Sequence, residues 1–357
     1  MPRVISKRRF VAIAMCAVAS LFLVPCMAHA AGVVDSDAGH YYSLAVLSDG
    51  SLWGWGYNAQ GQLGDGTLET HLAPSRVDTD AAFVDVSAGY RHSLAIRSDR
   101  TLWSWGWNKD GQLGIGHAEG VYVPSHWHST PAQVGTATNW LAIATGYDHS
   151  VALDSDFKIW TWGGNTLGQL GDGSTTPTST PVVVSTSPAP GLYWTRVWAA
   201  DDRSFAVASD GSLWHWGGGV LVPAKVTTTG PFASVKPASD AGWWTVSPVA
   251  GRLTAVLSDS SLWYWAGGDT VEPTFSGHEY FDVAECNAPD EAPALDGALM
   301  IALDHSLWAA TSDAGALNPL SVATKKYLLG NALNWTELSA GKNHFLIAKA
   351  DGSLWGW

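Results

Sequence analysis

Cysteine and positive charge are both scarce in this chain of 357 residues. Of its three cysteines, Cys16 and Cys26 lie in an N-terminal leader, which leaves Cys286 without an intramolecular disulfide partner. Lysine and arginine together number 19, against 32 aspartates and glutamates. Affinity for phosphate backbones comes largely from Lys and Arg displacing counterions, so this balance predicts that the chain binds no nucleic acid.

Long apolar runs are missing too, except in the leader. Residues 1–30 begin with four basic side chains, continue in an apolar run from Phe10 to Val24 and end at Ala28-His29-Ala30. These features are typical of an export signal, here cleaved after Ala30. The run is shorter than the about 20 residues that span a bilayer, so we expect a secreted or periplasmic chain with no membrane span. The mature chain then has 15 basic against 32 acidic residues, a net charge of −17.

Aromatic residues, in contrast, are abundant and regularly spaced. The segment Gly50-Ser-Leu-Trp-Gly-Trp-Gly56 is the first of seven built on a Leu-Trp or Ile-Trp pair. The first tryptophans of these pairs serve as anchors, at Trp53, Trp103, Trp160, Trp214, Trp263, Trp308 and Trp355. They are separated by 50, 57, 54, 49, 45 and 47 residues, a period that suits a propeller blade better than a solenoid coil.

Each repeat carries the signs of four short strands. Four residues before every anchor stands an aspartate, at Asp49, Asp99, Asp156, Asp210, Asp259, Asp304 and Asp351. Three of these are followed by glycine, and such pairs favour a tight hairpin between an apolar strand and the Leu-Trp-x-Trp strand. A further strand precedes this hairpin, and a short proline-led strand such as residues 74–77 follows it. We therefore predict one domain over residues 31–357, an all-β, seven-bladed propeller of four-stranded antiparallel blades.

The seventh repeat is shorter than the others. It stops at Trp357, before its loop and fourth strand. A closed ring needs that strand from somewhere, because an open sheet edge invites unwanted pairing. We expect the last blade to be incomplete and the sequence to be truncated at its C-terminus.

The alternation of tryptophan with small residues predicts how the blades pack. Side chains alternate across a strand, so Trp53 and Trp55 project to one face of their blade while Leu52 and Gly54 project to the other. In a ring of blades, each face packs on the next blade, and indoles on one side then meet small residues on the other. We predict that the Trp-Gly-Trp-Gly segment is the contact between blades.

These motifs, in this order, resemble the repeat of the regulator of chromosome condensation family. The clearest copies are Gly89-Tyr-Arg-His-Ser-Leu-Ala95 with Asn108-Lys-Asp-Gly-Gln-Leu-Gly114, and Gly146-Tyr-Asp-His-Ser-Val-Ala152 with Asn165-Thr-Leu-Gly-Gln-Leu-Gly171. The resemblance covers residues 32–357 and implies a propeller. The asparagine loop is intact in the first three repeats alone. The nuclear namesake's nucleotide exchange and chromatin binding do not carry over to an acidic chain with an export signal, since a shared fold does not transfer function.

Histidines are the obvious candidates for a metal site. His92, His149 and His344 each stand eleven residues before an anchor, where Arg203 stands in another repeat, so a hydrogen-bonding role is favoured over ligation. His126 and His128 project from one side of an extended segment but lack a near third ligand. We predict no metal and no cofactor. The aspartates before the anchors are assigned to turns, and because no catalytic motif is present we expect no enzyme.

Binding residues are sought among the tryptophans that the repeat does not explain. Seventeen of the 21 occupy repeat positions, whereas Trp107 matches Tyr57 in a loop and Trp127 lies in a longer loop of the same rim. Exposed aromatics are common anchors of binding surfaces. The predicted binding set is Tyr57, Trp107, His126, Trp127 and His128. The alternative is that these aromatics fold over their own blade.

The predicted function is an exported, non-enzymatic scaffold that presents a loop-rich rim to a protein or cell-envelope partner. One version is an inhibitor of a secreted enzyme such as a β-lactamase, since a secreted bacterial inhibitor has a similar repeat. A second alternative is an enzyme with a site at the central channel. A third is light sensing, because a plant ultraviolet-B photoreceptor has a similar repeat, but its Gly-Trp-Arg-His-Thr motif is absent here.

Overall fold

The computed structural model describes residues 32–77, 81–118 and 127–226 as continuous segments. Beyond them it describes residues 243–249, 252–257, 262–265, 272–273, 280–286, 297–302, 304–311, 325–330, 334–341 and 344–356. The predicted leader, His126 and Asp259 lie outside these residues. Among the residues described, no helix is long and apolar enough to cross a membrane.

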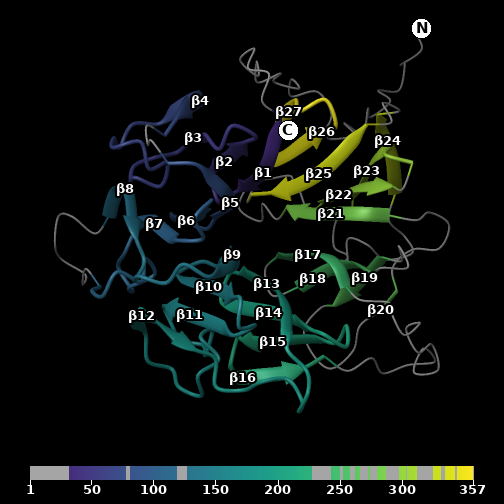
Figure 1. Ribbon diagram of the computed structural model, residues 1–357. Coiled ribbons are helices and arrows are strands. Elements are labelled where there is room, and N and C mark those ends of the chain that lie inside the picture. Colours follow the sequence, from purple (N-terminus) through teal and green to yellow (C-terminus); the bar gives the residue numbers. More distant parts are fainter. Residues whose placement is uncertain are drawn as a thin grey trace, which may run out of the picture.

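The described strands form six antiparallel sheets of four strands and one of three, each paired in chain order (Figure 1). The first two sheets are β1 (Val33–Ala38), β2 (Tyr42–Leu47), β3 (Leu52–Gly56) and β4 (His71–Arg76), then β5 (Phe83–Ala88), β6 (His92–Arg97), β7 (Leu102–Trp107) and β8 (Trp127–Gln133). The next two are β9 (Trp140–Thr145), β10 (His149–Asp154), β11 (Ile159–Gly163) and β12 (Thr178–Val183), then β13 (Trp194–Ala200), β14 (Arg203–Ala208), β15 (Leu213–Gly217) and β16 (Val220–Lys225). The last three are β17 (Trp243–Val249), β18 (Arg252–Leu257), β19 (Leu262–Trp265) and β20 (Glu272–Pro273); β21 (Tyr280–Cys286), β22 (Gly297–Ala302), β23 (Leu307–Thr311) and β24 (Lys325–Gly330); and β25 (Trp335–Ala340), β26 (Phe345–Lys349) and β27 (Leu354–Gly356).

The sheets follow one another around a common centre. The first strand of each sheet contacts the first strand of the next, from β1 and β5 through to β21 and β25, and β1 also contacts β25 and β26. In Figure 1 these first strands lie nearest the middle of the molecule. The predicted all-β propeller of four-stranded antiparallel blades is confirmed. Burial is described along every strand of five sheets, β1–β16 and β25–β27.

The hydrophobic core lies between neighbouring blades. One cluster joins Leu44 and Leu52 of the first sheet to Phe83 of the second. Another joins Leu346 of the last sheet to Ala45 of the first. Where side chains are described, neighbouring sheets therefore bury their apolar side chains against each other, as a two-sided strand pattern requires.

In the second, third and fourth blades, the second tryptophan of the Trp-x-Trp pair packs against the preceding blade. Trp105 is fully buried, and its indole Nε1 donates to the backbone oxygen of Gln62 at 2.7 Å. A Cβ added to Gly64 would lie 2.8 Å from that nitrogen, so a side chain there would displace the ring. The predicted nesting of indoles against small residues is confirmed, but the receiving glycine is Gly64 in a loop, and Gly54 packs under Leu63 of its own blade instead. The same seat recurs for Trp162 on Gly114 and for Trp216 on Gly171.

The aspartate before the anchor closes the hairpin turn in most described repeats. Asp49 Oδ1 accepts from the backbone nitrogen and the hydroxyl of Ser51, at 2.9 and 2.6 Å. Equivalent bonds form at Asp99, Asp210, Asp304 and Asp351. In the third repeat Asp156 lies in the turn, as predicted, but its side chain does not close it. Lys158 replaces the serine there and has no hydroxyl, so Asp154 accepts the turn nitrogens and the Trp160 indole.

The predicted hydrogen-bonding role of the repeated histidines is also confirmed. Each Nε2 contacts a serine hydroxyl of the next blade, in the pairs His92 and Ser150 at 3.0 Å, His149 and Ser204 at 2.8 Å, and His344 and Ser43 at 3.0 Å. The Ser150 hydroxyl already donates to the backbone oxygen of Gln112 at 2.8 Å, so His92 must donate from Nε2. Burial lowers the pKa of His92 and His149 to about 3 and that of His344 to about 4, which keeps these rings neutral.

Proline marks the outer edge of the blades. The prolines are Pro74 in β4, Pro131 in β8, Pro181 in β12 and Pro223 in β16. A proline removes one backbone donor from an exposed edge and so discourages pairing with another chain. The strands begin before their prolines, as β4 does at His71, so the predicted start at Pro74 was too late.

Candidate functional site

Each blade places two loops at the same end of its strands. Tyr42 of β2 lies opposite Gly56 of β3, so the loop before β2 and the loop after β3 share one face, here called the loop face. The opposite face, which carries the aspartate turns, is called the hairpin face. Three positions belong to the loop face: thirteen and twelve residues before the anchor, and four after it. In the first four sheets they hold His40, Tyr41 and Tyr57; Tyr90, Arg91 and Trp107; Tyr147, Asp148 and Gly164; and Asp201, Asp202 and Gly218.

Aromatic rings form a continuous row across the first three blades. His40 packs edge-on against Tyr41, with ring centroids 4.0 Å apart, and tilts against Tyr90 of the second blade at 4.2 Å. Tyr90 stacks on Tyr147 of the third blade at 4.0 Å. Tyr41 and Tyr147 are 45% and 46% exposed. His40 and Tyr90 are half-buried between them. These four residues are called the aromatic row, and its two ends present ring surface to solvent.

The backbone fixes the spacing of the aromatic row. The backbone nitrogen of His40 donates to the backbone oxygen of Gly89 in the second blade at 3.2 Å. The backbone nitrogen of Tyr147 donates to the backbone oxygen of Asp201 in the fourth blade at 2.9 Å. The row is thus held by the same blade-to-blade contacts that order the ring. Its side chains need little further ordering when a partner binds, which favours affinity.

The predicted rim tryptophans lie close to this row. Trp107 and Trp127 face each other as a pair across β7 and β8. The Arg91 guanidinium lies 5.1 Å from the Trp107 ring centre and 4.7 Å from that of Tyr90. Arg91 therefore connects the rim to the aromatic row through two cation–π contacts.

The remaining predicted residues are only partly brought together. His128 follows Trp127 on β8, and its ring centroid lies 6.0 Å from that of His117. Within the part of the chain that the structure describes, no group of three or more His, Cys, Asp or Glu side chains is placed to hold a metal ion. Tyr57 is 36% exposed, at the position in the first blade that Trp107 holds in the second.

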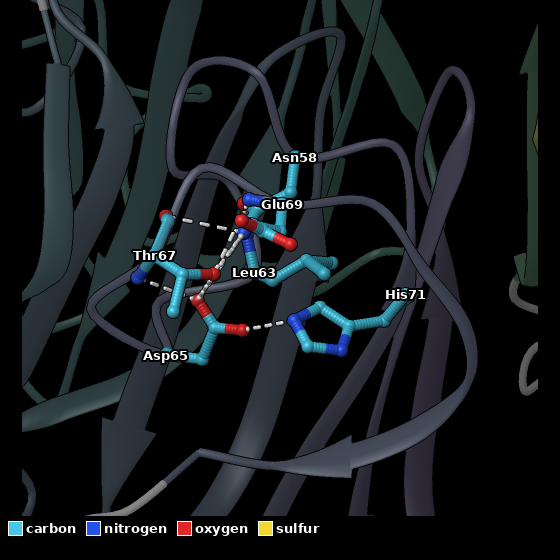
Figure 2. Close-up of polar contacts among 6 residues, drawn as sticks. All are labelled: Asn58, Leu63, Asp65, Thr67, Glu69 and His71. Carbon is cyan, nitrogen blue, oxygen red and sulfur yellow. Dashed lines mark hydrogen bonds and ion pairs between the residues drawn. The ribbon is translucent and has the colours of Figure 1, made fainter.

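The asparagine loops are closed by their own side chains. Asn58 is fully buried, and its Oδ1 accepts from the backbone nitrogen of Leu63 at 3.0 Å. Its Nδ2 donates to Asp65 Oδ1 and to the backbone oxygen of Thr67, both at 3.2 Å, and Asp65 Oδ2 pairs with His71 Nε2 at 2.7 Å (Figure 2). Asn108 and Asn165 make the same inward contacts. These loops are rigid supports for the loop face, and their asparagine amides serve the loop itself.

Over the third and fourth blades the loop face becomes acidic and hollow. Gly164 and Gly218 stand where the first two blades carry Tyr57 and Trp107. A hollow of about 430 Å³ opens there, called the acidic hollow; it is lined by Tyr147, Asp148, Leu167, Asp201, Asp202, Arg203 and Gly218. Tyr147 is therefore both the end of the aromatic row and a wall of the acidic hollow.

Carboxylates outnumber cations in the acidic hollow. Burial raises the pKa of Asp148 to about 6; a hydrogen bond from Gln169 Nε2 at 3.1 Å opposes this shift, and repulsion from Asp110 and Asp202 adds to it. Burial also raises the pKa of Asp202, and the charge of Arg203 offsets part of that rise. Such shifts mean that the local environment disfavours the ionised carboxylates, so an added cation would stabilise them.

A second group of carboxylates lies on the first strands, where three blades meet. Asp37 accepts from the Ser339 hydroxyl of the last blade at 2.8 Å, and Asp35 accepts from the backbone nitrogen of Val86 at 2.7 Å. Burial raises the pKa of Asp35 to about 6, although the residue is only half-buried overall. Burial and the neighbouring Asp35 raise the pKa of Asp85 well above its usual value. These carboxylates join neighbouring blades.

Sequence comparison assigns the repeats. A model of the regulator of chromosome condensation (RCC1) repeat matches residues 49–96, 100–153 and 158–207, and a second model of this repeat matches residues 33–62, 83–112 and 140–169. Residues 33–207 of this chain therefore consist of RCC1 repeats. The matched residues cover the first three blades and most of the first two strands of the fourth. The whole aromatic row lies within the matched residues.

Known RCC1-like proteins share parts of this chain. The ultraviolet-B receptor UVR8 of Arabidopsis thaliana is 28% identical over 149 residues, which make up 41% of this chain and 33% of the receptor. The RCC2 homolog of Xenopus laevis is 35% identical over 75 residues, 21% of this chain and 15% of that protein. The chain thus matches a third or less of the length of these relatives.

Solved structures agree in fold. Human WBSCR16 superimposes with a TM-score of 0.70 at 17% identity, over 89% of this chain and 86% of that one. Yeast RCC1 (Prp20), in its complex with Kap60, superimposes with a TM-score of 0.66 at 16% identity, over 91% and 80% of the two chains. At these identities the likeness establishes the propeller fold alone.

Two residues of the aromatic row, Tyr90 and Tyr147, were not predicted as surface residues because they belong to the repeat motif. Tyr90 and Tyr147 stand in the Gly-Tyr-x-His-Ser segments that carry the resemblance, yet they were not assigned to a surface. The signal was available, because aligning the repeats by their anchors places His40, Tyr90 and Tyr147 at one position. The hollow had a signal as well, in the change from aromatic residues to Gly164 and Gly218.

Proposed function

We propose that this chain is an exported, non-enzymatic, seven-bladed propeller whose loop face binds a protein partner. The observation that carries the proposal is the aromatic row, whose rings pack on one another, are exposed at Tyr41 and Tyr147, and stand on backbone that hydrogen bonds hold to the next blade. Rigid aromatic side chains that are exposed together are typical centres of protein interfaces. The Trp107 and Trp127 pair would extend this surface toward the outer rim.

Two further points support a binding role. Related RCC1 proteins are described with protein partners: yeast RCC1 is bound to Kap60, and Prp20p has binding properties toward Gsp1p and histones. In this chain Asp35 and Asp37 of the first strand accept hydrogen bonds across blade contacts, which favours a structural role over a catalytic one. An inhibitor of a secreted enzyme, as raised from the sequence, is one form of this proposal.

The proposal predicts two separate measurements. Export is tested by fractionating the producing cells and sequencing the mature N-terminus, which should begin at Ala31. A chain that stays in the cytoplasm with its leader intact would contradict the export part.

Binding is tested by placing a photo-crosslinking residue at Tyr41 in living cells. A matched control carries it at Tyr193, which is 47% exposed and packs against Phe157, the residue at the tip of a hairpin turn. We expect a discrete adduct from position 41 and none from position 193, and loss of the adduct when Tyr90 is replaced by alanine. Equal adducts from both faces would contradict a role for the loop face.

A further inference from the structure

The acidic hollow adjoins the aromatic row, and the two together define the chemistry of a ligand. Tyr147 stacks on Tyr90 and also lines the hollow, so a group inside the hollow would meet the exposed Tyr147 side chain. The lining includes carboxyl-bearing residues on two blades, Asp148 on one and Asp201 and Asp202 on the next. An aromatic face beside several carboxylates is a suitable environment for a cation.

Two glycines make room for the charged side chains of the acidic hollow. In the first two blades, the position four residues after the anchor is filled by Tyr57 and Trp107. Gly164 leaves that space to Asp148, since a Cβ on the glycine would overlap the Asp148 carboxylate. Gly218 likewise leaves room for the Arg203 guanidinium. The hollow is therefore a local exchange of aromatic bulk for charged groups, within an otherwise regular repeat.

The local charge balance sets the sign of the ligand. The lining contains three aspartates and one arginine. Arg203 acts on Asp202, but the pKa of Asp202 stays raised, so this one cation does not offset the cost of burial. The whole chain is acidic as well, with 32 acidic against 19 basic residues, and this would draw a basic partner toward the face.

We propose that the acidic hollow binds an arginine side chain of the partner protein, with its guanidinium stacked on Tyr147 and paired with Asp148 and Asp202. This inference rests on the proposed function, because it specifies part of the surface by which the loop face would bind its partner. Arginine is preferred to lysine because a planar guanidinium stacks on an aromatic ring and pairs with two carboxylates at once, whereas an ammonium group acts as a point charge. The volume of about 430 Å³ is in the range of about 300–1,000 Å³ that is typical of small-ligand sites.

The inference is tested with a small probe in place of the partner. N-acetyl-arginine methylamide is titrated into the exported chain at constant ionic strength, and binding is followed by ligand-observed NMR. The matched probe is the citrulline analogue, which has nearly the same shape and no charge. We expect saturable binding of the arginine probe, and binding at least fivefold weaker for both the citrulline and the lysine analogues.

Variants locate the bound probe. Asp202→Asn keeps the shape of the side chain and should weaken the arginine probe about fivefold, which corresponds to about 1 kcal/mol of ion pairing. Tyr147→Ala should weaken it by a similar factor. Glu69→Gln removes one negative charge from an exposed loop of the first blade and should leave the affinity unchanged. Circular dichroism and the Tm of each variant confirm that it is folded.

Three results would overturn the inference: equal affinity for the citrulline probe, equal affinity for the lysine probe, or unchanged affinity in Asp202→Asn. The outcome is independent of the crosslinking experiment at Tyr41. Arginine binding without a partner adduct would defeat the proposed function and leave the site standing. A partner adduct that Asp202→Asn does not diminish, together with equal probe affinities, would defeat the site alone.

Discussion

The close contact between the Trp162 indole and Gly114 predicts that Gly114→Ala lowers the free energy of unfolding by an unusually large amount. Gly114 has a φ of +70°, and a Cβ there would lie 2.7 Å from the Trp162 indole nitrogen. That nitrogen donates to the backbone oxygen of Gln112 at 2.8 Å, so the ring cannot move without loss of the bond. Gly114→Ala therefore adds both backbone strain and a clash between two blades.

Gly116 provides a control for the backbone strain. Its φ is +93°, but a Cβ there would meet no atom within 4 Å. Gly116→Ala should cost the left-handed strain alone, about 1–2 kcal/mol, and the change in unfolded-state entropy is the same for both substitutions. Gly114→Ala should cost about 1–3 kcal/mol more, which is the usual cost of overpacking a core.

Urea unfolding followed by tryptophan fluorescence measures the difference. Both variants must show the same dependence of the free energy on urea concentration, so that a shift in midpoint reports stability. If Gly114→Ala and Gly116→Ala differ by less than about 0.5 kcal/mol, the indole is not tightly seated on the glycine, and our account of the blade contact is wrong.

Three further predictions test the polar contacts. His149→Phe removes the bond to Ser204 and should lower the free energy of unfolding by about 1–3 kcal/mol at pH 7–8, measured by thermal unfolding. The difference from the unmodified chain should become smaller below about pH 6.5. There His149 takes up a proton in the unfolded chain but not in the folded chain, where its pKa is lowered to about 3. Asp85→Asn should raise the Tm at pH 7 and leave it nearly unchanged near pH 4, since a carboxyl whose folded pKa is raised gives stability that is present below pH 4 and lost as the pH rises through that folded pKa. An equal effect at both pH values would refute the raised pKa of Asp85. Asn108→Ala should leave two loop backbone groups unpaired, and hydrogen exchange of its loop should speed up while that of the hairpin face does not change.

Much of the propeller follows from the sequence because the repeat places large and small residues at fixed distances. The anchor tryptophans and the aspartates before them predicted the sheets and most of the turns. The exception at Asp156 arose because the alignment fixed the aspartate but ignored the residue two places later, where Lys158 cannot do what Ser51 does. The glycine that receives Trp105 was missed for a related reason, since Gly64 lies in a loop whose path depends on Asn58.

The loop face was less accessible to sequence reasoning. Stacking of Tyr90 on Tyr147 depends on the distance between two blades, and no spacing along the chain gives that distance. The search for surface aromatics began from residues that the repeat left unexplained, which selected Trp107 and Trp127. Tyr90 and Tyr147 belong to the repeat motif and were passed over, although their positions lie at the end of a strand, where a side chain can be both regular and exposed.

The repeat thus separates two sets of positions with different physical constraints. The seats of the indoles, the histidine–serine pairs and the asparagine loops lie between blades, where a change in volume or hydrogen bonding costs stability. The positions thirteen and twelve residues before the anchor and four after it lie outside these contacts, on backbone that the contacts hold fixed. The residue thirteen places before the anchor changes from aromatic, as at Tyr90, to acidic, as at Asp201, while the ring of blades continues. The surface formed by these positions can therefore differ from blade to blade, and in this chain it is aromatic over the first three blades and acidic over the third and fourth.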